Sequence, residues 1–317
     1  QRCTSLDEVI DWPAFSDASS ASSLRSTSRE EAEETSPVAT LVLCGHKPYQ
    51  DAKRFHWVPP KGWDSHARAL NVSARNNLSW DGRRPIPSPP AGEPWLLPCS
   101  DQMALRIARL RKPLVAAGWK VITSSPEVIE GLGDKAKLPD YAAKVGKLDF
   151  LPRHFQKPEQ ARYPCILKPS QGEFGRDSWI CYNAQDVMSH VPDFSASNWV
   201  LQELVPGSVE LSVSMLVSRG TILEVLGMKY LYDREVYIWP GVNELSKELY
   251  EVPAHHIPVL AAFVTEYDGI LNFNYKIRPD GRICIFEVNT RIGADLACDA
   301  PRERARQLFL MLDKIRG

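Results

Sequence analysis

A hairpin-like segment near the C-terminus constrains the fold more than any other part of this sequence. Apolar and polar residues alternate over residues 271–277 and again over residues 283–289, on either side of Asp280-Gly281. An Asp-Gly pair between two alternating runs is the strongest short-range signal for a β-hairpin. With a two-residue turn at this pair, Asn274 lies opposite Glu287.

In the same register Asn272 lies opposite Asn289, and all four side chains share one face of the hairpin because alternate strand residues point the same way. One carboxylate and three amides supply hard oxygen ligands, and Mg²⁺ is commonly held by one or two carboxylates together with substrate phosphates. The hairpin therefore predicts a metal site. An Asn ladder or a solvated strand face uses the same residue types, so the hairpin alone leaves both interpretations open.

The composition of the 317-residue chain excludes several classes of protein. Apolar residues make up 44% and charged residues 24% of the chain, as is ordinary for soluble globular proteins. A net charge of -1 argues against a protein that binds nucleic acid by neutralising phosphates. No apolar run reaches the ~20 residues that span a bilayer. Seven cysteines without a C-x-x-C pair favour buried thiols in a reducing compartment, and we expect a cytoplasmic protein.

The chain changes character along its length. Residues 1–36 are predicted to form a flexible N-terminal segment, because most of them are Ser, Ala, Glu and Thr with few large apolar groups. Residues 37–131 are predicted to form an α/β domain that contains a helix over residues 101–117. From residue 163 onward short β-like runs dominate. We therefore expect an α+β half that is rich in antiparallel pairing.

A lysine followed by a glycine-containing loop is a second candidate site. Lys168 ends a β-like run, and Gly172 and Gly175 follow it in a polar loop. Glycines let backbone N–H groups approach phosphate oxygens, and an ammonium group adds a point charge. The Gly-Lys-Ser/Thr ending of a Walker loop is absent. The segment is therefore either a different kind of phosphate-binding loop or an ordinary β-turn.

Other candidates are weaker when they are taken alone. Lys135 is predicted to lie at the start of a helix, where free N–H groups and the helix dipole favour anions. The backbone of residues 202–205 suits an adenine edge, and Glu210 on the next predicted strand suits ribose hydroxyls. Solvated lysines and solvated strand residues give the same patterns.

The order of these motifs resembles the ATP-grasp superfamily over roughly residues 95–300. The resemblance implies an α+β fold with an N-terminal α/β layer over residues 37–131. It further implies a small lid subdomain over residues 132–207 and a core subdomain over residues 208–317, with a mixed or antiparallel sheet that carries the metal site.

The resemblance also implies roles for the candidate residues. Lys135 and Lys168 would contact ATP phosphates, with Gly172 and Gly175 in the loop that closes over them. Lys168 and Arg291 would serve the reaction itself, Arg291 by holding the transferring phosphate or the acyl intermediate, although it is alternatively a surface arginine. The nucleoside would lie against Gln202, Glu203, Leu204, Val205 and Glu210.

Under the same resemblance Asn274, Glu287 and Asn289 would hold Mg²⁺, with Mn²⁺ as an alternative. The family commonly has Asp or Gln near the position of Asn274. Because Asn supplies a neutral oxygen, we expect one metal to bind more weakly here or to keep more water.

The activity implied by the resemblance is ATP-dependent ligation. A substrate carboxylate would be phosphorylated to an acyl phosphate, and an amine would then displace phosphate to form an amide. The expected partners are a small-molecule carboxylate and an amine, with neither nucleic acid nor a membrane. An ATP-dependent phosphotransferase and a non-catalytic ATP-binding module on the same fold are the alternatives.

Overall fold

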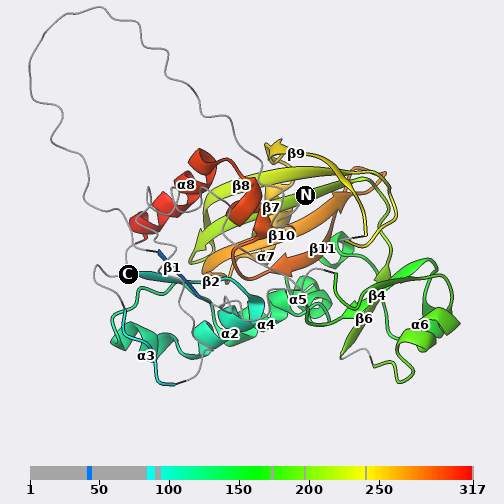
Figure 1. Cartoon of the computed structure of the whole chain (residues 1–317), viewed down its shortest axis with the longest axis horizontal. Helices are drawn as coiled ribbons and strands as arrows, with labels where there is room; N and C mark the ends of the chain where they lie inside the picture. The colour runs from blue at the N-terminus through cyan, green and yellow to red at the C-terminus, as the bar shows by residue number, and fades with distance from the viewer. Residues whose placement is uncertain are drawn as a thin grey trace, which may run out of the picture.

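A large antiparallel sheet with helices along one face forms the middle of the molecule (Figure 1). The computed structural model describes residues 41–44, 84–89, 94–172, 175–195, 198–239 and 241–315. The predicted flexible segment, residues 1–36, lies outside the described residues. Among the described helices, none combines the length and the apolar character that crossing a membrane requires.

The strands of the described residues form three sheets. A parallel pair joins β1 (Leu41–Cys44) to β2 (Trp95–Pro98). The large sheet has the order β11-β10-β7-β8-β9 and consists of β7 (Val209–Ser218), β8 (Thr221–Tyr232), β9 (Glu244–Tyr250), β10 (Gly269–Ile277) and β11 (Ile283–Asn289). The small sheet has the order β3-β6-β4-β5 and consists of β3 (His154–Phe155), β4 (Cys165–Pro169), β5 (Trp179–Cys181) and β6 (Trp199–Glu203).

Short helices connect and cover these sheets. The α-helices are α2 (Asp101–Arg109), α3 (Arg111–Ala116), α4 (Pro126–Gly133), α5 (Leu138–Lys144), α6 (Ala184–His190), α7 (Ile257–Phe263) and α8 (Arg302–Leu310). A π-helix, η4 (Asp295–Asp299), precedes α8, and short 3-10 turns occur at η2 (Leu148–Phe150), η3 (Pro158–Gln160) and η5 (Met311–Lys314).

The single helix predicted over residues 101–117 is wrong, because two helices occupy this segment. Ser100 caps α2 by accepting a hydrogen bond from the backbone N of Met103 (3.2 Å). The break falls at Leu110. Pro113 explains the break, since it has no N–H to donate to the carbonyl four residues earlier and its ring crowds that carbonyl.

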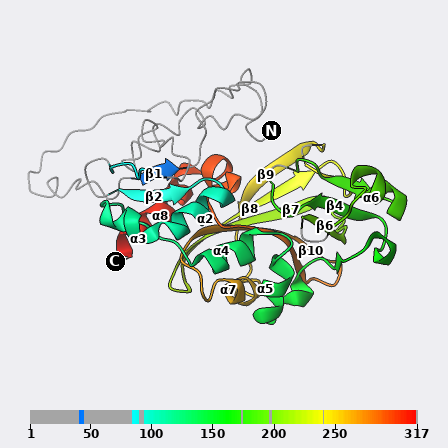
Figure 2. The same cartoon turned by 90° about the horizontal axis from the view of Figure 1, so that it is seen from below.

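Alternation along the large sheet gives its two faces different environments. The odd-numbered residues of β7 and β10 pack against α4, α5 and α7 and form the main core: Leu211, Val213, Met215, Leu271, Phe273 and Tyr275. Figure 2 shows these helices on one side of the sheet. Because alternate strand residues point to opposite faces, the even-numbered residues form the other face.

The even-numbered face is itself divided. At one end, Leu216, Leu226, Met228 and Ile270 are buried against η4, α8 and β2. Toward the small sheet the same face carries Glu210, Ser212, Asn274 and Lys276 instead. The small sheet buries one face against α6. Lys168, on its other face, reaches this polar end and donates a hydrogen bond to the carbonyl oxygen of Phe286 in β11.

The β10–β11 hairpin confirms the predicted pairs and corrects the predicted turn. Asn272 pairs with Asn289 and Asn274 with Glu287, as expected. Beyond Asn274 the register shifts, so that the tip is the three-residue loop 279–281, closed by a hydrogen bond from Arg278 N to Arg282 O (2.8 Å). The predicted two-residue turn is therefore wrong.

The physical reason for the longer turn lies in residues 279–281. Proline suits the second position of a type I turn, and Gly281, with φ of 84°, takes the left-handed position that follows it. The extra turn residue is offset by a bulge at Phe286, which has no partner in the ladder. Because of the bulge, Ile285 lies in the main core whereas Glu287 faces the polar side.

Replacing Phe273 by Ala should destabilise the protein strongly, because its ring is fully buried and contacts Phe263 edge-on, with centroids 6.0 Å apart. We expect the free energy of unfolding to fall by about 3–5 kcal/mol, measured by urea denaturation. Ile277→Ala on the same strand is the control, because Ile277 is 45% exposed. Equal losses in the two variants would contradict the assignment of the core face.

Candidate active site

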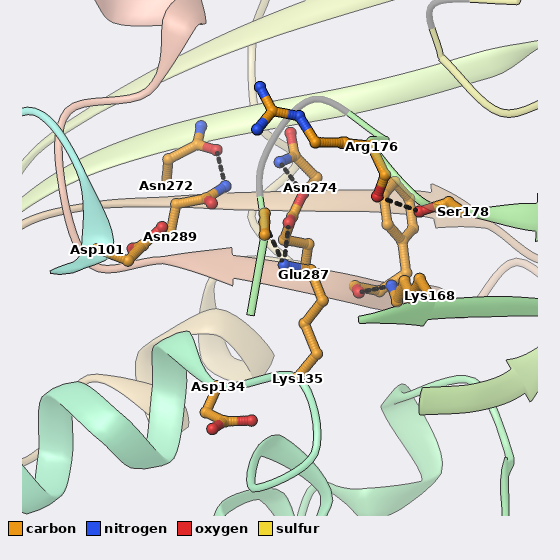
Figure 3. A network of polar contacts seen from close by, with 12 residues as sticks. Asp101, Asp134, Lys135, Lys168, Arg176, Ser178, Asn272, Asn274, Glu287 and Asn289 are labelled. Atoms are coloured by element: carbon orange, nitrogen blue, oxygen red, sulfur yellow. Dashed lines mark hydrogen bonds and ion pairs between the residues drawn. The ribbon is translucent and has the colours of Figure 1, made fainter. Parts of the chain in front are cut away.

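Side chains from three separate segments meet at the polar end of the large sheet (Figure 3). Glu287 and Asn274 come from the β11–β10 hairpin, and Lys168 comes from β4 of the small sheet. Lys135 comes from the turn between α4 and α5, three residues before α5 begins rather than at its start. The structure therefore brings together the residues that sequence analysis had selected separately.

Glu287 is the centre of this cluster. Its Oε1 lies 2.9 Å from Lys135 Nζ, and its Oε2 accepts a hydrogen bond from Asn274 Nδ2 (3.4 Å). Lys168 Nζ donates to the carbonyl oxygen of the neighbouring Phe286 (3.2 Å). The side chains of Lys135 and Glu287 are only 12% and 25% exposed, so solvent screens their interaction weakly.

Burial and charge act in opposite directions on these groups. Burial alone would raise the pKa of Glu287, but Lys135 and Lys168 outweigh it and lower this pKa to about 2. Burial and the charge of Lys135 lower the pKa of Lys168 to about 8. Burial opposes ionisation of Lys135 as well, yet Glu287 raises its pKa. At neutral pH the cluster therefore has two ammonium groups around an ionised carboxylate, an arrangement that attracts anions.

An amide network continues from Glu287 along the same face. Asn289 Nδ2 donates to Asn272 Oδ1 (3.2 Å), and Asn272 Nδ2 donates to Ser212 Oγ (2.8 Å). Behind it, Ser214 Oγ donates to Asp295 Oδ2 (2.8 Å), and burial raises the pKa of Asp295 to about 6. These bonds fix the orientation of the amides.

Arg291 lies at the end of this network. Its Nη2 donates to Asn289 Oδ1 (3.1 Å) and its Nη1 to the Ile292 carbonyl oxygen (3.0 Å). Its side chain is 13% exposed, so it is not a surface arginine. The guanidinium group therefore has a fixed place beside the amides.

The donor set suits a hard divalent cation only in combination with a ligand. Within the described part of the chain, no group of three or more His, Cys, Asp or Glu side chains is arranged to hold a metal ion. A cation here would depend on Glu287, on the amide oxygens of Asn274 and Asn289, and on oxygens of a bound phosphate. Mg²⁺ accepts such mixed coordination, so these residues fit it.

Comparison with known proteins places this geometry in context. No family model matches the sequence. The large chain of carbamoyl phosphate synthase from Vibrio cholerae is 23% identical over 199 residues, which cover 58% of this chain and 18% of that protein. This chain thus spans about a fifth of the length of that curated relative.

Solved structures give broader coverage. D-alanyl-alanine synthetase A from Vibrio cholerae superposes with a TM-score of 0.56 at 13% identity, covering 88% of this chain and 98% of that one. Carboxyaminoimidazole ribonucleotide synthase from Aspergillus clavatus, complexed with ATP, superposes with a TM-score of 0.54 at 13% identity, covering 88% and 78%. The chain has the ATP-grasp fold.

Within the ATP-grasp fold, charged side chains hold residues 202–207, which include the predicted adenine-binding segment at the end of β6. The Glu203 carboxylate accepts two hydrogen bonds from Arg278 (2.7 and 2.9 Å), and Glu203 N donates to Arg153 O (2.8 Å). Lys276 Nζ donates to the carbonyl oxygens of Gly207 (2.7 Å) and Val205 (3.3 Å). The sequence did not predict either set of contacts, because the residues that they join lie about 70 positions or more apart.

Tyr237 is a site residue that sequence analysis did not assign. It lies in the segment after β8, and its hydroxyl donates to Glu210 Oε2 (3.2 Å). Lys276 Nζ lies 4.2 Å from the centroid of its ring. Glu210, the predicted ribose-binding residue, is therefore covered by an aromatic side chain. The signal in the sequence was the aromatic run from Tyr230 to Trp239.

A hollow of ≈ 270 Å³ adjoins the small sheet, between α5 and strands β3 and β6. His154 and Val200 line it, and Val200 pairs directly with Lys168. Burial, together with the charge of Lys168, lowers the pKa of His154 to about 4. The imidazole of His154 is therefore uncharged at neutral pH, while Asp140 contributes an acidic side chain to the same lining.

The glycines of the loop after β4 have different surroundings. Gly172 O accepts a hydrogen bond from Lys135 Nζ (2.9 Å), and a Cβ at Gly172 would meet only Pro169, at ordinary distance. Gly175 has φ of 62°, and a Cβ there would collide with the carbonyl oxygen of Trp239. The loop after β4 and the segment after β8 thus touch at Gly175.

Gly175→Ala should separate these two segments, because it adds a methyl group where backbone atoms are already in contact and strains a left-handed residue. We expect faster amide hydrogen exchange at residues 233–239. Gly172→Ala is the matched control, since its neighbours leave room for a methyl group. Unchanged exchange in Gly175→Ala would show that the contact does not hold the segment.

Proposed function

We propose that this chain is an ATP-dependent ligase that activates a carboxylate as an acyl phosphate and joins it to an amine. The observation that carries the proposal is the cluster in which Lys135 and Lys168 flank the ionised Glu287 beside amide oxygens. Two ammonium groups suit a polyphosphate, and Glu287 with neighbouring amides suits the Mg²⁺ that accompanies it. ATP bound to a protein of the same fold supports this choice of ligand.

The nucleotide would lie between the two sheets. We propose that Lys135 and Lys168 contact its phosphates, with Gly172 and Gly175 in the covering loop. The nucleoside would lie against Gln202, Glu203, Leu204, Val205 and Glu210. This arrangement corresponds to a lid subdomain over residues 132–207 and a core over residues 208–317, preceded by the α/β layer of residues 37–131.

In the first step a carboxylate oxygen of the substrate attacks the γ-phosphorus of ATP. A new P–O bond forms, the bond to the β-phosphate oxygen breaks, and ADP leaves. The carboxylate is already nucleophilic, so the protein contributes positioning and charge neutralisation. Lys168 and Arg291 have the charge and the fixed geometry for this role. Mg²⁺ held by Asn274, Glu287 and Asn289 would neutralise further phosphate charge.

In the second step the amine attacks the acyl carbon, the bond to phosphate breaks and the nitrogen loses a proton. Acyl phosphates hydrolyse readily, so the intermediate needs protection from water. Gly175 lies against the backbone of Trp239, and this contact would cover one side of the proposed site. The free thiols at Cys99, Cys165, Cys181 and Cys284 suit a reducing compartment such as the cytoplasm.

Glu287→Gln should reduce substrate-dependent release of ADP by about 100-fold or more, because it leaves Lys135 and Lys168 without their counter-charge and removes the carboxylate ligand. The assay measures ADP in the presence of Mg²⁺ and a panel of amino acids and small carboxylates. Glu266→Gln is the matched control, since its ion pair with Lys144 is 51% and 60% exposed.

The products decide between the competing functions. Release of ADP and phosphate that depends on an added amine supports ligation, whereas a stable phosphorylated product indicates a phosphotransferase. Tight binding of ATP without turnover indicates a non-catalytic module. Unchanged turnover in Glu287→Gln would rule out the proposed site.

ATP binding should take up a proton near pH 8 to 9. Lys168 has a pKa of about 8 in the free protein, so part of it is neutral there, and adjacent phosphates raise that pKa. Affinity should accordingly fall as the pH rises through 8. Calorimetry in buffers of different ionisation enthalpy measures the uptake. Lys168→Arg should abolish it, because a guanidinium group stays charged. Equal uptake in both proteins would exclude Lys168 as its source.

A further inference from the structure

Asp101 joins the N-terminal layer to the segment that follows β11. It is the first residue of α2, and its Oδ1 accepts two hydrogen bonds from Thr290, one from the backbone N (2.8 Å) and one from Oγ1 (3.2 Å). Thr290 is 1% exposed and directly follows Asn289, the last residue of β11. A single carboxylate oxygen therefore fixes the main chain one residue beyond the amide cluster.

The other oxygen of Asp101 faces Arg291. Asp101 Oδ2 lies 3.7 Å from Arg291 Nε, and that nitrogen is buried. The far end of the same guanidinium group donates to Asn289. Arg291 is thus held on one side by the amide network and on the other by a negative charge from a different layer of the molecule.

A second contact strengthens this junction. Ile292 N lies 3.5 Å from the carbonyl oxygen of Pro98, at the end of β2. Ser100 caps α2 between these two contacts, so Pro98 and Asp101 belong to one short rigid corner. The corner therefore holds residues 290–292 at both ends.

We propose that Asp101 is a positioning residue of the active site, which orients Arg291 toward the reacting phosphate by holding Thr290 and the Arg291 guanidinium together. This inference rests on the proposed function, because it gives the N-terminal layer a part in catalysis. Misplacing a reacting or stabilising group by about 1 Å costs on the order of 100-fold in rate. A carboxylate that fixes both the backbone and the side chain prevents such displacement.

The field of Asp101 also reaches Lys135. Burial lowers the pKa of Lys135, but Glu287 and, to a smaller extent, Asp101 raise it, and the net result is a pKa above the ordinary value. Asp101 therefore supports the charge of a phosphate-facing lysine without touching it. This contribution agrees with a role in the site rather than only in the folding of α2.

The decisive variant is Asp101→Asn. Its amide oxygen can still accept both hydrogen bonds from Thr290, but no negative charge then faces Arg291. We expect kcat to fall ~10- to 100-fold while the KM for ATP changes by less than about threefold. Thr290→Val tests the hydroxyl contact alone. Glu127→Gln, an exposed acid in the first turn of α4, is the control and should retain full activity.

A double-mutant cycle tests whether Asp101 acts through Arg291. If it does, Asp101→Asn should add little to the loss caused by Arg291→Gln. Multiplying losses would overturn the proposal, because they would show independent roles. A loss seen only as a lower melting temperature, with kcat unchanged in the folded protein, would overturn it as well.

A readout without turnover separates this inference from the proposed function. Hydrogen exchange at the Arg291 Nε–H, followed by ¹⁵N NMR and assigned with Arg291→Lys, should be at least about tenfold faster in Asp101→Asn. If the wild-type protein forms no ADP with any carboxylate, the proposed function fails, and the exchange rate alone decides whether Asp101 holds Arg291. Unchanged exchange would refute the inference even in an active enzyme.

Discussion

The rest of the site depends on one interaction, the ion pair between the ionised carboxylate of Glu287 and Lys135, with the ammonium group of Lys168 nearby. Lys135 binds the carboxylate itself, whereas Lys168 binds the carbonyl oxygen of the preceding residue, Phe286. This part of β11 therefore fixes the α4–α5 turn and the small sheet relative to the large sheet. Removing one partner of a partly buried charge pair leaves an uncompensated charge and is strongly destabilising. The residues proposed to bind ATP are thus also the residues that hold the segments together.

This arrangement explains why polar residues occupy an otherwise buried face. A strand face that packed only against helices would carry aliphatic and aromatic residues throughout, as the odd-numbered face does. Along β7 and β10 the even-numbered face changes within a few residues from the apolar Leu216 and Ile270 to the polar Ser212, Asn274 and Glu210. The apolar end of this face contributes to folding stability, and the polar end leaves its side chains available to bind a ligand.

The sequence predicted the parts of the site that depend on local patterns. Alternation and an Asp-Gly pair sufficed to place Asn274 opposite Glu287. The β-like run that ends in a lysine was enough to select Lys168. The predicted pairs were right although the turn was wrong, since the longer turn and the bulge at Phe286 offset each other. The missed residues, Asp101 and Tyr237, contact partners 189 and 27 positions away, and no local periodicity encodes such contacts. The break between α2 and α3 was missed because the helical spacing of apolar residues was given more weight than the helix-breaking effect of Pro113.

The bulge at Phe286 makes the strand tolerant of a change in length at that one position. Because Phe286 has no partner in the ladder, its deletion would leave Ile285 opposite Tyr275 and Glu287 opposite Asn274, with their faces unchanged. Deleting a paired residue such as Val288 would instead bring Asn289 opposite Phe273, on the core face. The hairpin can therefore lose a residue at the bulge without moving its polar side chains, but not at its paired positions.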